Sequence, residues 1–180
     1  MTDTKEQARI KALYRYNLLD TPADGSLDKL TQLAANQFNL PIAIVTLVDT
    51  DRIWFKSKYG LEVNEIGRDP GLCASAILSD DIYLVEDARN DPRTLANPLV
   101  AGSFGLQFYA AVPLRTRDGF NLGTFCLIDK NKRYFNTDQQ KSLKLFGEVI
   151  MEFLELRMEA HNNLNEMKAK LDFYERQRIS

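Results

Sequence analysis

Apolar positions follow two different spacings along the 180-residue chain, and the changes between them mark the expected elements. A spacing of three to four residues predicts helices over residues 4–19 and 26–38 and from residue 137 onwards, with Ser26 expected to cap the second. Runs of β-branched and aromatic residues predict strands over 42–48, 53–58, 82–85 and 108–128. The last run contains Asp118-Gly119, a pair typical of a tight type I′ hairpin turn. A short helix is expected over 72–78, and Gly and Pro predict loops over 60–71 and 87–105, the latter around one helical turn.

The second strand of the 108–128 hairpin is apolar on both faces apart from Thr124. A strand with one wet face would alternate, so this strand is expected in the middle of a sheet that is covered on both sides. Because the strand pairs are hairpins, the sheet is predicted to be mainly antiparallel, within an α+β fold. Helices from both termini are expected to cover one face. The loop-rich 60–105 segment is expected to cover the other, which favours a cavity there.

The C-terminal segment predicts a long helix. Thr137 and Gln140 have the spacing of a capping box, and apolar residues then recur every three to four positions, interrupted by Arg157 and Arg178. We therefore predict two regions, a globular domain over 1–157 and a coiled-coil helix over 158–180. The alternative is a helix that folds back on its own domain. The residues predicted at a homodimer interface are Leu164, Met167, Leu171 and Tyr174.

Composition narrows the possible functions. Lys and Arg number 23 against 25 Asp and Glu, which argues against nucleic acid as a partner. No apolar run is long enough to cross a bilayer and no signal peptide is evident, so membrane insertion is not expected and a cytoplasmic location is predicted. The single histidine, His161, lies in the helical tail, which excludes His-based nucleophile sites and His-rich zinc sites in the globular part. On these grounds we expected no catalytic residue, no metal site and no enzyme.

Six short motifs follow one another along the chain. They are Arg52-Ile-Trp-Phe-Lys-Ser57, Cys73-Ala-Ser-Ala-Ile-Leu78, Asp87-Ala-Arg-Asn-Asp-Pro-Arg93, Asn97-Pro-Leu-Val-Ala-Gly102, Phe108-Tyr-Ala-Ala-Val-Pro-Leu114 and Leu122-Gly-Thr-Phe-Cys-Leu-Ile-Asp129. In this order and spacing they resemble a GAF domain of the kind found near the N-terminus of bacterial sensor histidine kinases and diguanylate cyclases. The resemblance runs from about Ala8 to Arg157. It implies an antiparallel sheet of five or six strands, a small-molecule pocket on one face, and terminal helices that dimerise and transmit signals.

The pocket that the resemblance implies would draw on the hairpin, the short helix and the long irregular segment. Two positions depart from the family pattern, because Ser75 stands where a histidine is common and Gln107 stands where an arginine is common. Cys73 has two interpretations, a small buried hydrophobe or a reactive thiol at the pocket edge. The candidate ligand-binding residues are Cys73, Ser75, Asp87, Arg93, Gln107, Phe108, Tyr109 and Thr124.

The function predicted from these features is a non-catalytic sensory and dimerisation module in bacterial signal transduction, such as a two-component system or a diguanylate cyclase pathway. An unidentified small molecule would bind it, and the coiled coil would carry the signal to an output domain in cis or in trans, since the apolar repeat runs to Ser180 without a helix-breaking residue. Two alternatives remain open, an enzyme acting through Cys73 and a scaffold without ligand. A weaker ligand-specific variant is cyclic-nucleotide binding, suggested by a partial motif that also reads as a turn and helix cap: Asn131, Lys132, Phe135, Asp138 and Gln139.

Overall fold

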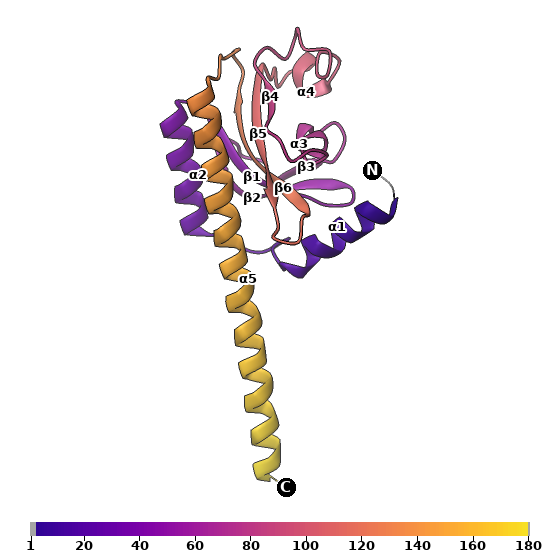
Figure 1. Cartoon of the computed structure of the whole chain (residues 1–180), viewed down its shortest axis with the longest axis vertical. Helices are drawn as coiled ribbons and strands as arrows, with labels where there is room; N and C mark the ends of the chain where they lie inside the picture. Colours follow the sequence, from indigo (N-terminus) through magenta and orange to yellow (C-terminus); the bar gives the residue numbers. More distant parts are fainter. Residues whose placement is uncertain (1–2, 180) are drawn as a thin grey trace.

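The computed structural model describes residues 3–179 and confirms the α+β arrangement (Figure 1). The helices are close to the ranges that the apolar spacing predicts. Asp24, and not Ser26, caps the second helix, because its side chain accepts from the backbone N–H groups of Ser26 and Leu27. In chain order the elements are α1 (Asp3–Arg15), α2 (Gly25–Phe38), β1 (Ile42–Val48), β2 (Arg52–Tyr59), β3 (Glu65–Gly67), α3 (Leu72–Ala76), β4 (Tyr83–Val85), α4 (Pro98–Ala101), β5 (Phe108–Arg115), β6 (Asn121–Asp129) and α5 (Thr137–Ile179).

The strands form one six-stranded antiparallel sheet in the order β3-β2-β1-β6-β5-β4. β1 and β6 occupy its centre, and every residue of both strands is buried, as the lack of polar alternation predicts. The edge strand β3 lies inside the predicted 60–71 loop. It spans three residues and two of them are exposed, so no apolar pattern could reveal it.

The hairpin between β5 and β6 is confirmed, but its turn is not the predicted type I′. Gly119 N–H donates to Thr116 O at 2.9 Å, which closes a four-residue turn, and Thr116 N–H donates to Phe120 O at 2.9 Å. Gly119 has a φ of 90°, whereas Asp118 is not among the residues with positive φ. A type I′ turn requires positive φ at both central residues. The pattern is that of an ordinary turn followed by a left-handed glycine, so the loop is longer than the Asp-Gly signal predicts.

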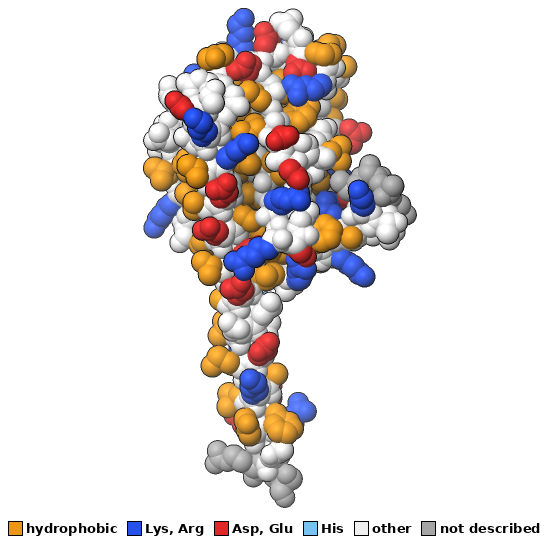
Figure 2. Space-filling view, viewed as in Figure 1, with side chains coloured by type: hydrophobic (Ala, Val, Ile, Leu, Met, Phe, Trp, Pro, Cys, Tyr) orange, Lys and Arg blue, Asp and Glu red, His pale blue; other side chains and the backbone are white. Residues whose placement is uncertain are grey.

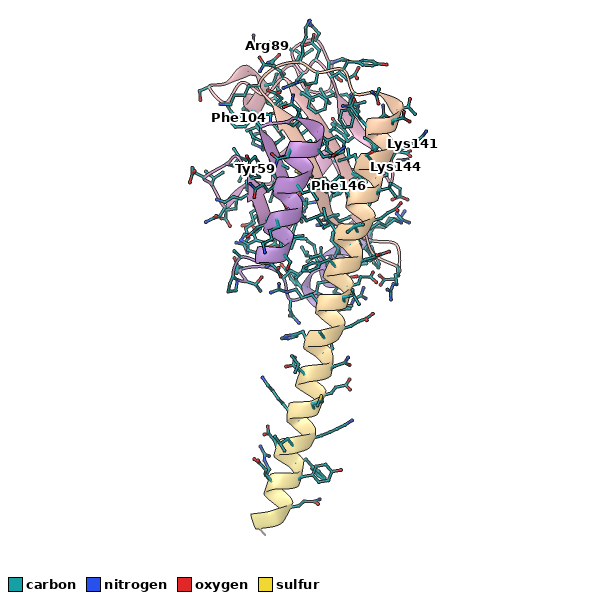
Figure 3. All side chains as sticks on the ribbon, turned by 90° about the vertical axis from the view of Figure 1, so that its left-hand side faces the viewer. Tyr59, Arg89, Phe104, Lys141, Lys144 and Phe146 are labelled. Carbon is teal, nitrogen blue, oxygen red and sulfur yellow. The ribbon has the colours of Figure 1, made fainter. Side chains whose placement is uncertain are left out.

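Helices α2 and α5 lie side by side over one face of the sheet (Figures 1 and 3). The rings of Phe38 of α2 and Phe146 of α5 pack in a tilted arrangement with centroids 5.6 Å apart. A Cβ atom on Gly147 would lie 2.7 Å from Cγ1 of Val112 on β5, so α5 approaches the sheet at a distance that only glycine allows. The apolar side of α1 joins this same core through Ala12 and Leu13, followed by Tyr16 just after the helix.

α5 is one continuous helix of 43 residues, and its first half packs on the sheet while its second half projects beyond the domain (Figure 1). Its capping box is one residue earlier than predicted. Gln139 N–H donates to Asn136 Oδ1 at 2.9 Å, and Asn136 N–H donates to Gln139 Oε1 at 3.0 Å. Gln139 and Gln140 are adjacent, so the capping-box spacing fits both registers, and the stronger N-cap preference of asparagine over threonine favours the observed one.

The opposite face is covered by α3, α4 and the connecting segments, as expected. Alternate residues of each strand reach this side, where they form a second apolar core with Leu72, Cys73 and Ala76 of α3, and with Val100 and Leu106. The loop-rich cover therefore packs against the centre of the sheet with buried apolar side chains.

Candidate functional site

A cluster of thiol and hydroxyl groups lies between α3 and the centre of the sheet. Tyr109 Oη of β5 donates a hydrogen bond to Cys73 Sγ of α3 at 3.2 Å. Thr46 Oγ1 of β1 and Thr124 Oγ1 of β6 are 2.9 Å apart, and the Thr46 hydroxyl also contacts the Thr124 backbone. All of these side chains are buried, and Cys126 of β6 completes the group. We refer to Cys73, Cys126, Tyr109, Thr46 and Thr124 as the thiol cluster.

The surroundings shift the pKa values of the two thiols of the cluster in opposite directions. Hydrogen bonding from Cys126 is the largest influence on Cys73. Together with Thr124, Tyr109 and Thr46 it outweighs burial and lowers the pKa of Cys73 to about 6. The same contact with Cys73, together with burial, raises the pKa of Cys126 well above its usual value. Burial and the neighbouring thiols likewise raise the pKa of Tyr109. The two thiols therefore titrate as a coupled pair.

The structure brings three of the predicted ligand-binding residues into this cluster, namely Cys73, Tyr109 and Thr124. Phe108, the neighbour of Tyr109, points to the opposite face, as successive strand residues do. Its ring contacts Phe135 with centroids 5.5 Å apart. Ser75 is exposed on α3, where it lines a separate cavity of about 560 Å³ with Arg68, Pro70 and Asn97 among others.

The remaining predicted residues make local contacts. Arg93 pairs with Asp91, donates to the Leu84 carbonyl at 2.7 Å and lies over the Tyr83 ring, so it fixes the Asp-Pro-Arg turn. Asp87 accepts a hydrogen bond from Asn90 Nδ2 at 2.9 Å. Gln107 Nε2 donates to the adjacent Leu106 carbonyl at 3.0 Å. None of these contacts connects the three residues to the thiol cluster.

The partial cyclic-nucleotide motif is also engaged locally. Asn131 donates to the Asp129 carboxylate through its backbone and side chain, at 2.9 and 3.1 Å. Gln139 belongs to the capping box of α5. Phe135 is buried against Phe38 and Phe108. A turn, a helix cap and a core side chain therefore account for this motif.

Sequence reasoning missed Lys56, which is only 3% exposed although its side chain carries an amine. The register of β1 and β2 shifts here, because Val45 pairs with Ser57 and Thr46 pairs with Phe55. Lys56 is therefore the extra residue of a β-bulge, a device that re-aims a side chain. Its amine donates to Thr21 Oγ1 at 2.7 Å and to Pro22 O at 2.9 Å, and burial lowers its pKa. The sequence holds no local signal for a bulge at this position.

The predicted dimer residues lie on the projecting half of α5. All four are more than half exposed, at 56% for Leu164 and 68% for Met167. Figure 2 shows apolar side chains along this projecting helix and beside α2. Nearer the domain, Leu33 of α2 and Leu145 and Val149 of α5 are also exposed, and they line a shallow cavity of about 320 Å³ between the two helices.

Across residues 3–179, no helix is long and apolar enough to cross a membrane. In the same range, no group of three or more His, Cys, Asp or Glu side chains is placed to hold a metal ion.

The fold and the sequence define the class of this protein. The sequence model of the GAF domain matches residues 22–154, so the chain belongs to the GAF domain family. The division at residue 157 stays a prediction.

Known proteins with similar sequences or structures include enzymes. A cyclic di-GMP phosphodiesterase of Pseudomonas aeruginosa is 37% identical over 128 residues, which are 71% of this chain and 22% of the relative. The chain thus spans about a fifth of the length of that relative. A type II free methionine-R-sulfoxide reductase of Thermoplasma acidophilum has a TM-score of 0.60 at 19% identity, over 84% of this chain and 95% of its own. The GAF domain of an Acinetobacter phosphoenolpyruvate-protein phosphotransferase has a TM-score of 0.58 at 15% identity, over 92% and 99%.

These matches contradict the expectation that the chain is not an enzyme. The curated relative is named as a phosphodiesterase, and the structural neighbours include free methionine-R-sulfoxide reductases, including one of Neisseria meningitidis. The expectation was wrong because the lack of histidine in the globular part excludes only chemistry that needs histidine. It says nothing about thiol or carboxylate chemistry, or about activity elsewhere in a larger protein.

Proposed function

We propose that this chain is the sensory and dimerising part of an enzyme of cyclic di-GMP signalling, and that α5 joins it to the catalytic unit. The observation that carries the proposal is the form of α5. This helix begins at Thr137, packs closely on the sheet at Gly147, and runs without interruption into an exposed apolar stripe. The curated relative supports the enzymatic context, because this chain matches only about a fifth of a phosphodiesterase.

The exposed stripe supports dimer formation. Leu164, Met167, Leu171 and Tyr174 lie three to four residues apart, the spacing of a coiled-coil seam, and the domain offers them no packing. A helix surface of this kind is stable in water when a second helix covers it. A second copy of the chain presents the same stripe, so the two stripes can pair in a symmetric dimer.

Signal transmission would use the two cores of the sheet. A ligand that changes the packing of the α3 face acts on β5 and β6, and β5 and β6 also carry α5 on their other face. Small shifts of a helix at such a contact are a known way to switch a dimer. Signalling therefore needs no contact between the ligand and α5.

The dimer is tested by light scattering on the purified chain. The double variant Leu164→Lys, Leu171→Lys is expected to be a monomer where the wild type is a dimer. The matched control is Asn162→Lys, Ala169→Lys, which adds the same charge on the opposite side of the helix and should remain a dimer. A dimer of unchanged mass in the first variant would contradict the proposal.

The enzymatic context is tested by reading the gene beyond codon 180. A phosphodiesterase sequence in the same frame supports the proposal, and a stop codon directly after Ser180 contradicts it. Native mass spectrometry with an absorption spectrum of the purified protein tests the sensory role, since added mass or a visible band would indicate a retained small molecule.

A second candidate function is thiol chemistry at Cys73. The observation that favours it is the hydrogen bond from Tyr109 in a group that lowers the pKa of the Cys73 thiol to about 6. The thiolate is the nucleophilic form of cysteine, so a lowered pKa favours it. Cys73 is only 6% exposed, so this chemistry also requires that a substrate gains access to the buried thiol. Activity that is lost in Cys73→Ser, with the fold retained by circular dichroism, would support this candidate over the sensory one.

A further inference from the structure

The two cysteines of the chain meet in the core although they come from distant parts of the sequence. Cys73 lies on α3 and Cys126 lies in the middle of β6, and both belong to the apolar core between this helix and the sheet. The hydrogen-bonding contact between the two thiols places their sulfur atoms next to each other. Both thiols are free. Because the chain has no third cysteine, a disulfide within one chain can join only this pair.

The two thiols differ in their distance from solvent. Cys126 is fully buried, at 0% exposed, whereas Cys73 is 6% exposed. α3 spans only five residues, and Ala74 and Ser75 on its outer side line the cavity of about 560 Å³ described above. This cavity is therefore separated from Cys73 by the thickness of one short helix. A small oxidant that enters from this side reaches Cys73 before Cys126, which lies beneath α3 on the sheet.

Tyr109 prepares Cys73 for attack on an oxidant. Its hydroxyl donates a hydrogen bond to Cys73 Sγ at 3.2 Å, and a donor in this position stabilises the thiolate. The ring of Tyr109 packs edge-on against Tyr83, with centroids 6.0 Å apart, so its hydroxyl is held in place. The lowered pKa of the Cys73 thiol agrees with this geometry. Of the two sulfur atoms, Cys73 is thus the better first nucleophile.

We propose that Cys73 and Cys126 form a reversible disulfide when a small peroxide reaches the thiol cluster, and that this bond ties α3 to a central strand of the sheet. Cys73 is the sulfur that is oxidised first, and Cys126 is the sulfur that resolves the product. The proposal goes beyond the signalling role above and does not rest on it, because the reaction needs neither the dimer nor a catalytic unit.

The reaction balances with one molecule of peroxide. The Cys73 thiolate attacks a peroxide oxygen and the O–O bond breaks. The released hydroxide takes up the proton that Cys73 gave up, which leaves a sulfenic acid and one water. The sulfur of Cys126 then loses its proton and attacks the Cys73 sulfur, the S–O bond breaks, and the leaving hydroxide combines with that proton to form a second water. Two thiols lose two electrons, and the peroxide gains them.

Oxidation would change the packing of α3. The two sulfur atoms must approach more closely in a disulfide than in a hydrogen bond, so the bond draws α3 onto β6. Tyr109 at the same time loses the thiolate to which it donates, and its buried hydroxyl needs another partner. β6 also contacts α5 on the other face of the sheet. The reduced and oxidised forms therefore differ at a strand that both faces share.

The test is intact-mass spectrometry of the reduced, folded chain after treatment with hydrogen peroxide. We expect the mass to fall by two hydrogen atoms and dithiothreitol to restore it. Proteolysis without reductant should yield a peptide pair that joins Cys73 to Cys126, and non-reducing electrophoresis distinguishes this product from a disulfide between two chains. Amide hydrogen exchange over residues 72–76 should be slower in the oxidised form, because the bond ties α3 down.

Variants separate the roles of the two sulfur atoms. Cys126→Ala leaves Cys73 without a resolving thiol, so dimedone should trap it as the sulfenic acid. Cys73→Ala should leave Cys126 reduced, because that thiol is fully buried. Tyr109→Phe should slow disulfide formation about fivefold, through the lost hydrogen bond. Tyr83→Phe is the matched control, because it removes a hydroxyl beside the same ring and should leave the rate unchanged.

The proposal is overturned if the wild type keeps its mass in peroxide, or if it gains oxygen atoms without losing hydrogen. It is equally overturned by a disulfide that forms only between two chains, by oxidation of Cys126 in Cys73→Ala at the wild-type rate, or by equal effects of the two tyrosine variants. None of these outcomes bears on the dimer, which light scattering tests separately.

Discussion

Arg157 of α5 forms an ion pair with Asp24, the residue that caps α2. One oxygen of Asp24 accepts from the backbone of Ser26 and Leu27 at 3.1 and 3.4 Å, and the other meets the guanidinium. On the same stretch of α5, Glu155 pairs with Arg117 at 2.5 Å and accepts from Tyr16 at 3.3 Å. The place where α5 leaves the domain is therefore held by charged and polar contacts to three other segments.

Replacing Asp24 should cost more stability than replacing Arg157. Asp24→Ala removes a helix cap and leaves Arg157 unpaired, so we expect a loss of about 1–2 kcal/mol. Arg157→Gln removes only a partly exposed ion pair and should cost about 0.2–1 kcal/mol. Urea unfolding of both variants and of the double variant measures the coupling between them. Equal losses in the two single variants would show that the cap carries no stability of its own.

Gly147→Ala should destabilise the protein, although alanine usually stabilises a helix. In an exposed helix the change would gain about 1 kcal/mol. Here the new Cβ would lie 2.7 Å from the Val112 side chain, and overpacking of this kind costs about 1–3 kcal/mol. Thermal unfolding shows directly whether the variant is less or more stable than the wild type. Adding Val112→Ala should recover part of the loss, and no recovery would mean that the cost arises elsewhere.

Acid should weaken the contact of α1 with the sheet through Glu6. Burial tends to raise the pKa of Glu6, but hydrogen bonds from Arg9 and Arg68 lower it to about 2. A carboxyl group whose pKa is lower in the folded state stabilises the fold above its unfolded pKa. That contribution is lost as the pH falls from about 4.5 towards about 2. The wild type should therefore exceed Glu6→Gln in urea midpoint at pH 6, and the difference should shrink by pH 3. A difference that is independent of pH would contradict this account.

The ionisation of Cys73 should depend on Cys126. Because Cys126 provides the largest influence that lowers the pKa of Cys73, the variant Cys126→Ala should raise that pKa from about 6 towards its usual value. Thiolate absorbance near 240 nm, followed against pH, measures it without requiring a reagent to enter the core. Cys126→Ala has one thiol left, and Cys73→Ala serves as the control for the other. An unchanged absorbance step below pH 7 would exclude this role for Cys126.

The sequence predicts most of the fold because the strands and helices bury regular apolar patterns. β1 was predicted with its observed ends, 42–48, since every residue of it is apolar apart from Thr46, which is β-branched. What the sequence could not predict depends on contacts between distant residues. The three-residue strand β3 forms because its backbone pairs with Arg52, Ile53 and Trp54 of β2. The bulge that buries Lys56 depends on how β1 and β2 align.

The candidate site was likewise predictable only in part from the sequence. The meeting of Cys73, Tyr109 and Thr124 was expected, because the resemblance places them on elements that face each other. Phe108 was assigned to the same pocket although it neighbours Tyr109 in one strand, so the two could not share a face.

Arg157 divides α5 into two arms of different length. A helix rises about 1.5 Å per residue, so Gly147 lies about 15 Å on one side of Arg157 and Ile179 about 33 Å on the other. If α5 moves as a rigid rod about the Arg157–Asp24 contact, a displacement of about 1 Å at Gly147 becomes about 2 Å at the far end, in the opposite direction. The helix would then act as a first-class lever whose long arm lies outside the domain, with the ion pair as its fulcrum.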